Sequence, residues 1–153
     1  MINLKNNYIQ DKYLKYAHDV VSGKQVAGKL IKLSCQRYLD LMNDTRYEFR
    51  PDKCERVLSF VSKLKHYQGK CAGKQFVLEE WQKWIIYSIF GFYYKDSNER
   101  LVKKALLTVG RKNGKSFLIA AMALYMLIAD GEPAAQVLNI ANNTKQAHLL
   151  FEM

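Results

Sequence analysis

A short apolar run, a basic loop with two glycines and a long apolar run follow one another between residues 105 and 129, and this order restricts the fold more than any other stretch of the chain. The apolar run 105–109 predicts a buried strand over residues 104–109, whereas residues 117–129 are apolar over a length that predicts a helix. The loop between them, residues 110–116, reads Gly-Arg-Lys-Asn-Gly-Lys-Ser. A strand, a glycine-containing loop, a Lys-Ser pair and a helix form the order of a phosphate-binding loop.

The residue types in this loop suit the binding of phosphate. Gly110 and Gly114 give the backbone freedom, so that N–H groups can wrap phosphates beside the positive N-terminal end of the following helix. Lys115 would reach the β- and γ-phosphates, and the Ser116 hydroxyl would hold Mg²⁺. Val109 stands where the usual pattern has its first glycine, so a strand-to-helix turn that happens to contain Gly-Lys-Ser stays open as an alternative.

A second apolar run, residues 136–141, predicts another strand after the long helix. Strand, helix and strand at this spacing form a right-handed crossover, which places the two strands parallel in one sheet. A phosphate-loop ATPase also needs an apolar strand that ends in Asp to hold Mg²⁺, and a carboxylate or other group that positions the attacking water. Residues 136–141 are followed instead by Asn142 and Asn143. We therefore expect an α/β chain with an incomplete parallel sheet, the first part of a larger P-loop ATPase domain.

Apolar residues recur at helical spacing in three early segments, which predicts helices at residues 8–21, 28–42 and 51–64. Residues 76–78 form a short extended piece, two glutamates open a largely buried helix over residues 79–94, and a last helix is expected from residue 145. The predicted division is a helical N-terminal region, residues 1–68, and the first part of the P-loop domain, residues 69–153.

The composition indicates an anionic partner. The chain carries 24 Lys and Arg against 14 Asp and Glu, a net charge of +10, although a merely solvated basic face explains the excess about as well as a nucleic-acid groove does. Three cysteines without a Cys-x-x-Cys pair predict neither a zinc site nor a disulfide framework, which fits a reduced cytoplasm. The longest uninterrupted apolar run, residues 117–129, is too short to cross a bilayer, so no membrane partner is expected.

Taken together, these motifs resemble the large subunit of tailed-phage terminases, the ATP-driven motor and nuclease that packages viral DNA. The resemblance spans nearly the whole chain and rests on residues 19–24, 60–69, 76–82, 109–116 and 141–147. The third and fourth of these segments are the most specific. In this family the phosphate loop need not begin with glycine and carries an arginine, which accommodates Val109 and Arg111.

The resemblance implies roles for individual residues. Trp81 and Gln82 match the family's adenine-recognition motif, so Gln82 is expected to hydrogen-bond the adenine edge while a neighbouring aromatic ring packs on the base. Arg111 matches the arginine that senses or stabilises the γ-phosphate; the alternative is simple attraction to nucleotide or DNA. The expected catalytic residues are Lys115 and Arg111, Ser116 is the expected Mg²⁺ ligand, and the remaining loop contacts to ATP come from Gly110, Lys112, Asn113 and Gly114.

For the whole protein, the resemblance implies that Mg²⁺-ATP hydrolysis drives double-stranded DNA into a capsid in the cytoplasm of the bacterial host. The implied partners are the portal protein and the terminase small subunit, and the implied state is a ring-shaped oligomer. The family's Mg²⁺-binding Asp and catalytic Glu lie on a strand that follows the segments matched here, so the 153-residue chain by itself is expected to be inactive. A catalytically inactive module that binds nucleotide, DNA or protein, and another nucleic-acid-dependent ATPase of helicase-like type, stay open as alternatives.

Overall fold

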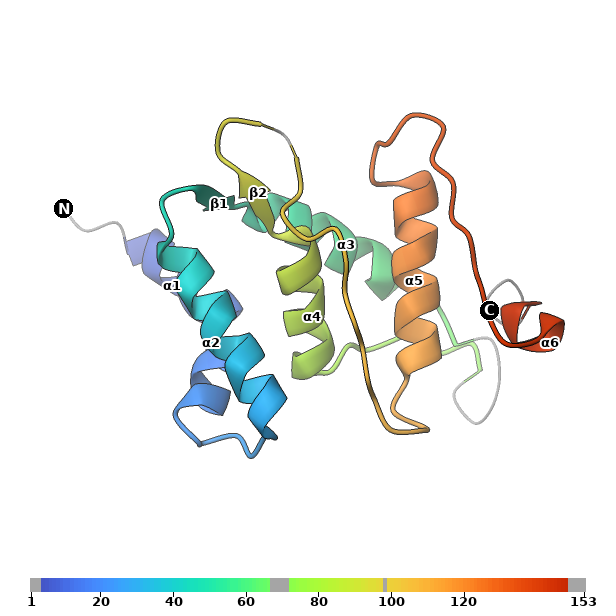
Figure 1. The fold of residues 1–153 in the computed structure, drawn as a ribbon, viewed down its shortest axis with the longest axis horizontal. Coiled ribbons are helices and arrows are strands. Elements are labelled where there is room, and N and C mark those ends of the chain that lie inside the picture. The colour runs from blue at the N-terminus through green and yellow to red at the C-terminus, as the bar shows by residue number, and fades with distance from the viewer. Residues whose placement is uncertain (1–3, 67–71, 98, 149–153) are drawn as a thin grey trace. The chain divides into compact units, whose positions relative to one another are not determined.

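The computed structural model describes residues 4–66, 72–97 and 99–148. In these ranges the chain forms α1 (Leu4–Val21), α2 (Lys29–Asn43), β1 (Tyr47–Phe49), α3 (Pro51–Lys63), α4 (Glu80–Phe90), β2 (Phe92–Tyr94), α5 (Lys115–Ile128) and α6 (Thr144–His148) (Figure 1). None of the helices in the described ranges combines the length and the apolar character needed to cross a bilayer. Two compact units form, one from Met1–Cys54 with Glu79–Ala105, the other from Glu55–Leu78 with Leu106–Met153.

The first unit is organised around aromatic residues from α1, α2 and α4. The Tyr38 hydroxyl donates a hydrogen bond to the Tyr13 carbonyl at 3.2 Å, and the Tyr13 ring meets the Tyr87 ring edge-on at 4.8 Å. Burial raises the pKa of Tyr38, so this hydroxyl stays neutral. Cys35 and Cys54 are buried, and neither is in a disulfide with another described residue, while Cys71 lies outside the described residues.

A two-stranded antiparallel sheet joins residues far apart in the sequence. β1 pairs with β2 in the register Tyr47 with Tyr94, Glu48 with Tyr93 and Phe49 with Phe92. The Phe49 and Phe92 rings lie 5.1 Å apart, and Phe92 is fully buried. The predicted helix over residues 79–94 is therefore wrong at its C-terminal end: it stops at Phe90, and Gly91 leads into a strand whose aromatic side chains find partners on β1. β1 itself was not predicted.

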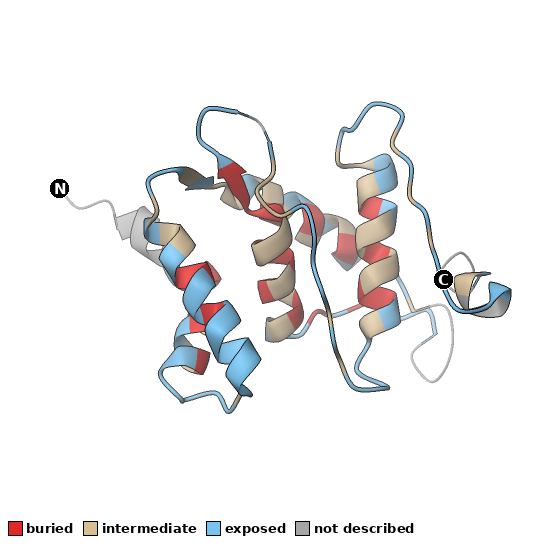
Figure 2. Ribbon diagram, viewed as in Figure 1, coloured by how far each residue is buried: buried red, intermediate tan, exposed pale blue. Residues whose placement is uncertain are grey.

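In the second unit, side chains of α3 contact α5 at two points. The Phe60 and Tyr125 rings meet edge-on at 5.6 Å, and Arg56 Nη2 donates to the Ala129 carbonyl, at the C-terminal end of α5, at 3.0 Å. A cation there complements the negative end of the helix dipole. Figure 2 shows the buried positions of α5 as a stripe, whereas the extended segments before and after this helix are mostly exposed.

The predicted strands at residues 104–109 and 136–141 are extended but unpaired. Across the described ranges the sheet of β1 and β2 is the only one, so the expected parallel sheet is not formed there, although the chain is mixed helix and strand. Leu106, Leu138 and Ile140 consequently remain 95 %, 82 % and 89 % exposed. The other predicted helices are confirmed to within a few residues, and the division at residue 68 stays a prediction.

The close approach of Gly91 to β1 yields a prediction about stability. A Cβ added at Gly91 would lie 2.3 Å from Phe49 Cε2 and 2.6 Å from the Tyr87 carbonyl oxygen, whereas one at Gly28 would meet no heavy atom within 4 Å. Gly91→Ser is expected to lower the free energy of unfolding by about 1–3 kcal/mol through overpacking. Gly28→Ser, at the N-cap of α2, should be neutral or slightly stabilising. Urea unfolding measures both, and equal stability of the two variants would contradict the packing described.

Candidate functional site

The backbone of the loop before α5 alternates between left-handed and ordinary conformations. Lys112 and Gly114 both lie in the left-handed region, with φ of 66° and 71°, and Asn113 stands between them. Asn113 Nδ2 donates to the carbonyl oxygens of Gly110 at 3.2 Å and Arg111 at 3.4 Å, which ties the loop to itself. Left-handed residues that alternate with ordinary ones turn successive N–H groups toward one side, the geometry of an anion-binding nest.

The first turn of α5 continues this arrangement. The first intrahelical hydrogen bond of α5 runs from Leu118 N to the carbonyl of its N-cap, Gly114, at 3.0 Å, and Gly114 contributes no side-chain cap. The N–H groups of Lys115, Ser116 and Phe117 therefore precede the helical ladder. Unsatisfied donors and the positive end of the helix dipole together favour an anion at this place.

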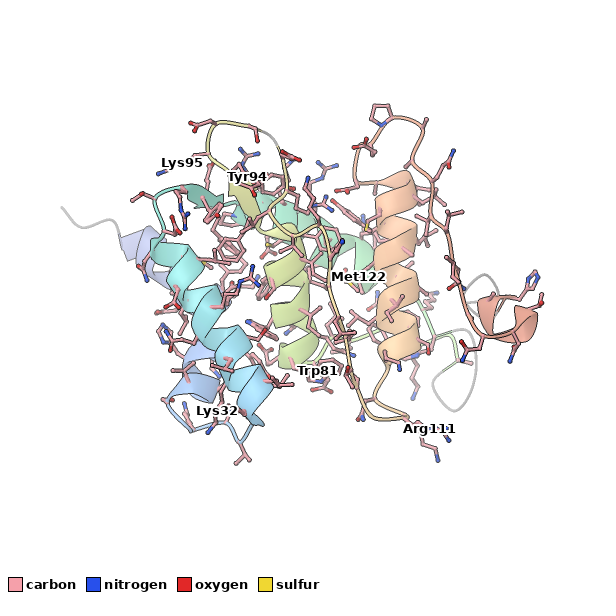
Figure 3. The ribbon with its side chains drawn as sticks, in the orientation of Figure 1. Lys32, Trp81, Tyr94, Lys95, Arg111 and Met122 are labelled. Atoms are coloured by element: carbon pink, nitrogen blue, oxygen red, sulfur yellow. The ribbon has the colours of Figure 1, made fainter. Side chains whose placement is uncertain are left out.

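The side chains of the loop add positive charge. Lys115 is half-buried, whereas Arg111, Lys112 and Ser116 are exposed, and Figure 3 shows Arg111 projecting from the loop away from α5. In the part of the chain that the structure describes, no carboxylate forms an ion pair with Arg111, Lys112 or Lys115. The loop thus presents an uncompensated cationic surface.

Aromatic packing holds the first turn of α5. The Phe117 ring stacks on the Phe76 ring at 3.9 Å, and the His66 ring lies 5.4 Å from Phe117. The backbone joins these contacts, since Phe76 N donates to the Leu64 carbonyl and His66 N to the Lys74 carbonyl. Sequence reasoning missed this cluster; the available signal was an aromatic residue directly after the Lys-Ser pair.

Trp81 and Gln82 lie in the first turn of α4, in the first unit, whereas the loop belongs to the second unit. Trp81 is half-buried and is labelled in Figure 3. Gln82 is only 3 % exposed, and its Oε1 accepts a hydrogen bond from the Glu79 backbone N–H at 2.9 Å, which caps the helix. Within the described residues its Nε2 group makes no hydrogen bond.

The donor set fits a magnesium ion that arrives with a nucleotide. The described residues contain no group of three or more His, Cys, Asp or Glu side chains that could hold a metal. Magnesium bound with a nucleotide needs few protein ligands, because phosphate oxygens and water complete its octahedral shell. The exposed Ser116 hydroxyl at the start of α5 is an oxygen donor of the kind that such an ion accepts.

Comparison with known families finds a similarity over the part of the chain that holds this arrangement. Residues 80–153 match an ATPase domain, a region that includes α4, the loop and α5. The family is described as the terminase large subunit, ATPase domain, so the predicted resemblance is confirmed for this part of the chain. No curated protein and no solved structure matches the chain.

The left-handed residues give a test of the loop geometry. Gly114→Ala is expected to cost about 1–2 kcal/mol of unfolding free energy, because a Cβ disfavours the left-handed conformation. Lys112→Gly should be nearly neutral, since relief of this strain, about 1 kcal/mol, offsets the extra entropy that glycine gives the unfolded chain. Gly110→Ala is the control, because Gly110 lacks a positive φ and only the Asn113 amide, 3.2 Å away, must shift. Equal stability of Gly114→Ala and Gly110→Ala would contradict the left-handed conformation of Gly114.

Proposed function

We propose that residues 110–116 bind the phosphates of ATP as the P-loop of a terminase-type ATPase. The observation that carries the proposal is the alternating loop, left-handed at Lys112 and Gly114, which leads directly into the uncapped first turn of α5. This loop lies inside the region that matches the terminase ATPase domain. Backbone donors, a helix N-terminus and three unpaired cations then act on one polyanionic ligand.

Each polar residue of the loop has a distinct role in this proposal. Lys115 binds the β- and γ-phosphates, Arg111 binds the γ-phosphate with its planar guanidinium group, and Gly110, Lys112, Asn113 and Gly114 supply the surrounding backbone. Ser116 holds Mg²⁺, which neutralises phosphate charge when it is bound with the nucleotide. Asn113 keeps the loop in its binding conformation through its two hydrogen bonds to backbone carbonyls.

Trp81 and Gln82 are proposed to recognise the adenine base. The free Nε2 group of Gln82 is a donor that suits an acceptor nitrogen of adenine, while its Oε1 already binds the Glu79 N–H. The Gln82 amide therefore caps α4 through Oε1 and hydrogen-bonds the adenine base through Nε2. Its position in the first turn of a helix and its burial restrict its rotamers, which favours selective recognition.

In the whole protein, ATP binding and hydrolysis would power the packaging of double-stranded viral DNA, in the host cytoplasm, with the portal protein and the small subunit as partners. The proposed domain has a parallel sheet in which residues 104–109 and 136–141 are strands, and the motor works as a ring oligomer. Support comes from the family match and from the apolar side chains that both extended segments expose, which neighbouring strands of a sheet would cover.

A second candidate function is binding without hydrolysis. The observation that favours it is the excess of basic residues, 24 Lys and Arg against 14 Asp and Glu. With its net charge of +10, such a module would bind nucleotide or DNA with an affinity that falls steeply as salt is added.

Calorimetric titration of Mg²⁺-ATP tests the loop. Lys115→Ala is expected to weaken binding by about 10–150-fold, the loss of charge-assisted hydrogen bonds worth about 1.5–3 kcal/mol. Lys95→Ala is the control, since Lys95 is an exposed lysine outside the loop and its removal changes the net charge equally. Phosphate release followed in the same samples distinguishes hydrolysis from binding alone. Equal binding by both variants would sink the assignment, and turnover lost with Lys115→Ala would exclude the binding-only function.

The ratio of ATP to GTP affinity tests Gln82. Gln82→Ala is expected to reduce the preference for ATP by about 2–10-fold, the worth of one hydrogen bond of about 0.5–1.5 kcal/mol. Gln82→Glu retains an oxygen that can accept the Glu79 N–H but loses the amide donor, so it should reduce the preference similarly. An unchanged ratio in both variants, with a lowered melting temperature in Gln82→Ala, would show that Gln82 only caps α4.

A further inference from the structure

α2 carries apolar side chains on two sides, and only one side packs within its unit. Cys35, Tyr38 and Leu39 are buried, and Tyr38 reaches α1 through its hydrogen bond. Leu30 and Leu33, in contrast, are 79 % and 57 % exposed. Since they are three residues apart on a helix, they lie side by side on its surface.

A third exposed apolar residue lies in the loop before α2. Val26, four residues before Leu30, is 91 % exposed, so three large apolar side chains within eight residues face away from the core of the unit. A single exposed leucine is common on protein surfaces, but a contiguous apolar group marks a contact site.

Cations surround these apolar side chains. Lys29 and Lys32 precede the two leucines by one residue each, and Arg37 follows Leu33 by four, which places it on the same side of the helix. All three cations are exposed, and among the described residues none has a carboxylate partner. The one acidic residue of α2, Asp40, already accepts a hydrogen bond from Gln36 at 2.9 Å. We call this group the α2 surface and define it as Val26, Lys29, Leu30, Lys32, Leu33 and Arg37.

We propose that the α2 surface binds an acidic amphipathic helix of a partner protein. Such a helix offers an apolar stripe to Leu30 and Leu33 and carboxylates to the flanking cations, so both halves of the surface are matched. A nucleic-acid backbone would pair with the cations but would leave the leucines in water. A lipid surface would need a broader apolar face than two leucines and one valine provide.

Fluorescence anisotropy tests the proposal on the 153-residue protein. The probe is a labelled synthetic helix with Leu at i, i+3, i+4 and i+7 and Glu at the other positions. Combined Leu30→Ser and Leu33→Ser are expected to weaken its binding roughly tenfold or more, because two burials are lost. Leu127→Ser, at a leucine 45 % exposed on α5, is the matched control and should bind as the wild type does. Lys32→Glu should weaken binding more than Lys95→Glu, which changes the net charge equally.

The apolar variants separate the proposed contact from plain charge attraction. They keep the net charge of the protein. Their thermal melting midpoints should equal that of the wild type, since the substituted side chains are exposed. Absence of peptide binding, or binding that the leucine substitutions leave intact, would overturn the proposal. If the leucine substitutions weaken binding to a DNA duplex or to phosphatidylglycerol vesicles more than binding to the peptide, the proposal is overturned as well.

Discussion

Backbone N–H and C=O groups of an extended segment need a neighbouring strand or water, and this requirement decides which strands the chain forms. Residues 47–49 find residues 92–94, and the aromatic pair Phe49 and Phe92 stabilises the match. Residues 104–109 and 136–141 find no such neighbour within the described ranges. Their side chains nevertheless alternate between exposed and half-buried over 106–110 and 136–140, as in strands with one covered face. The local conformation is thus consistent with the parallel sheet proposed for the whole domain.

The loop at the start of α5 shows a different balance, in which backbone strain is retained in the proposed phosphate-binding loop. A lysine in the left-handed conformation costs about 1 kcal/mol relative to glycine, yet Lys112 adopts it. The hydrogen bonds of Asn113 and the aromatic packing of Phe117 hold both ends of the loop, so the surroundings over-determine the strained residue. Such strain supports a binding role because it pre-organises N–H groups before the ligand arrives.

Sequence reasoning predicted the elements whose signals are local. The helices predicted over residues 28–42, 51–64 and 117–129 follow from apolar periodicity, a proline at a first turn and a continuous apolar run, and the structure has them as α2, α3 and α5. The pairing of β1 with β2 could not be predicted, since it depends on residues more than forty positions apart and three-residue strands carry little periodicity. For the candidate site, the loop and the start of its helix were predicted, whereas the cap formed by Gln82 was missed. Its signal was the spacing of three from Glu79 to Gln82.

The cationic side chains of the protein fall into two groups, those that pair with carboxylates and those that do not. The first group is already compensated: Lys15 and Lys24 pair with Asp19, Arg46 pairs with Asp44, and Arg50 pairs with Glu48 while it covers the Tyr93 ring. The Asp44 pKa falls to about 2 because Arg46 donates hydrogen bonds to it, so this pair stays ionised at neutral pH. The second group, on the loop before α5 and on the α2 surface, has no carboxylate partner among the described residues. The compensated cations serve the fold, whereas the six cations at these two places are available to bind anionic ligands.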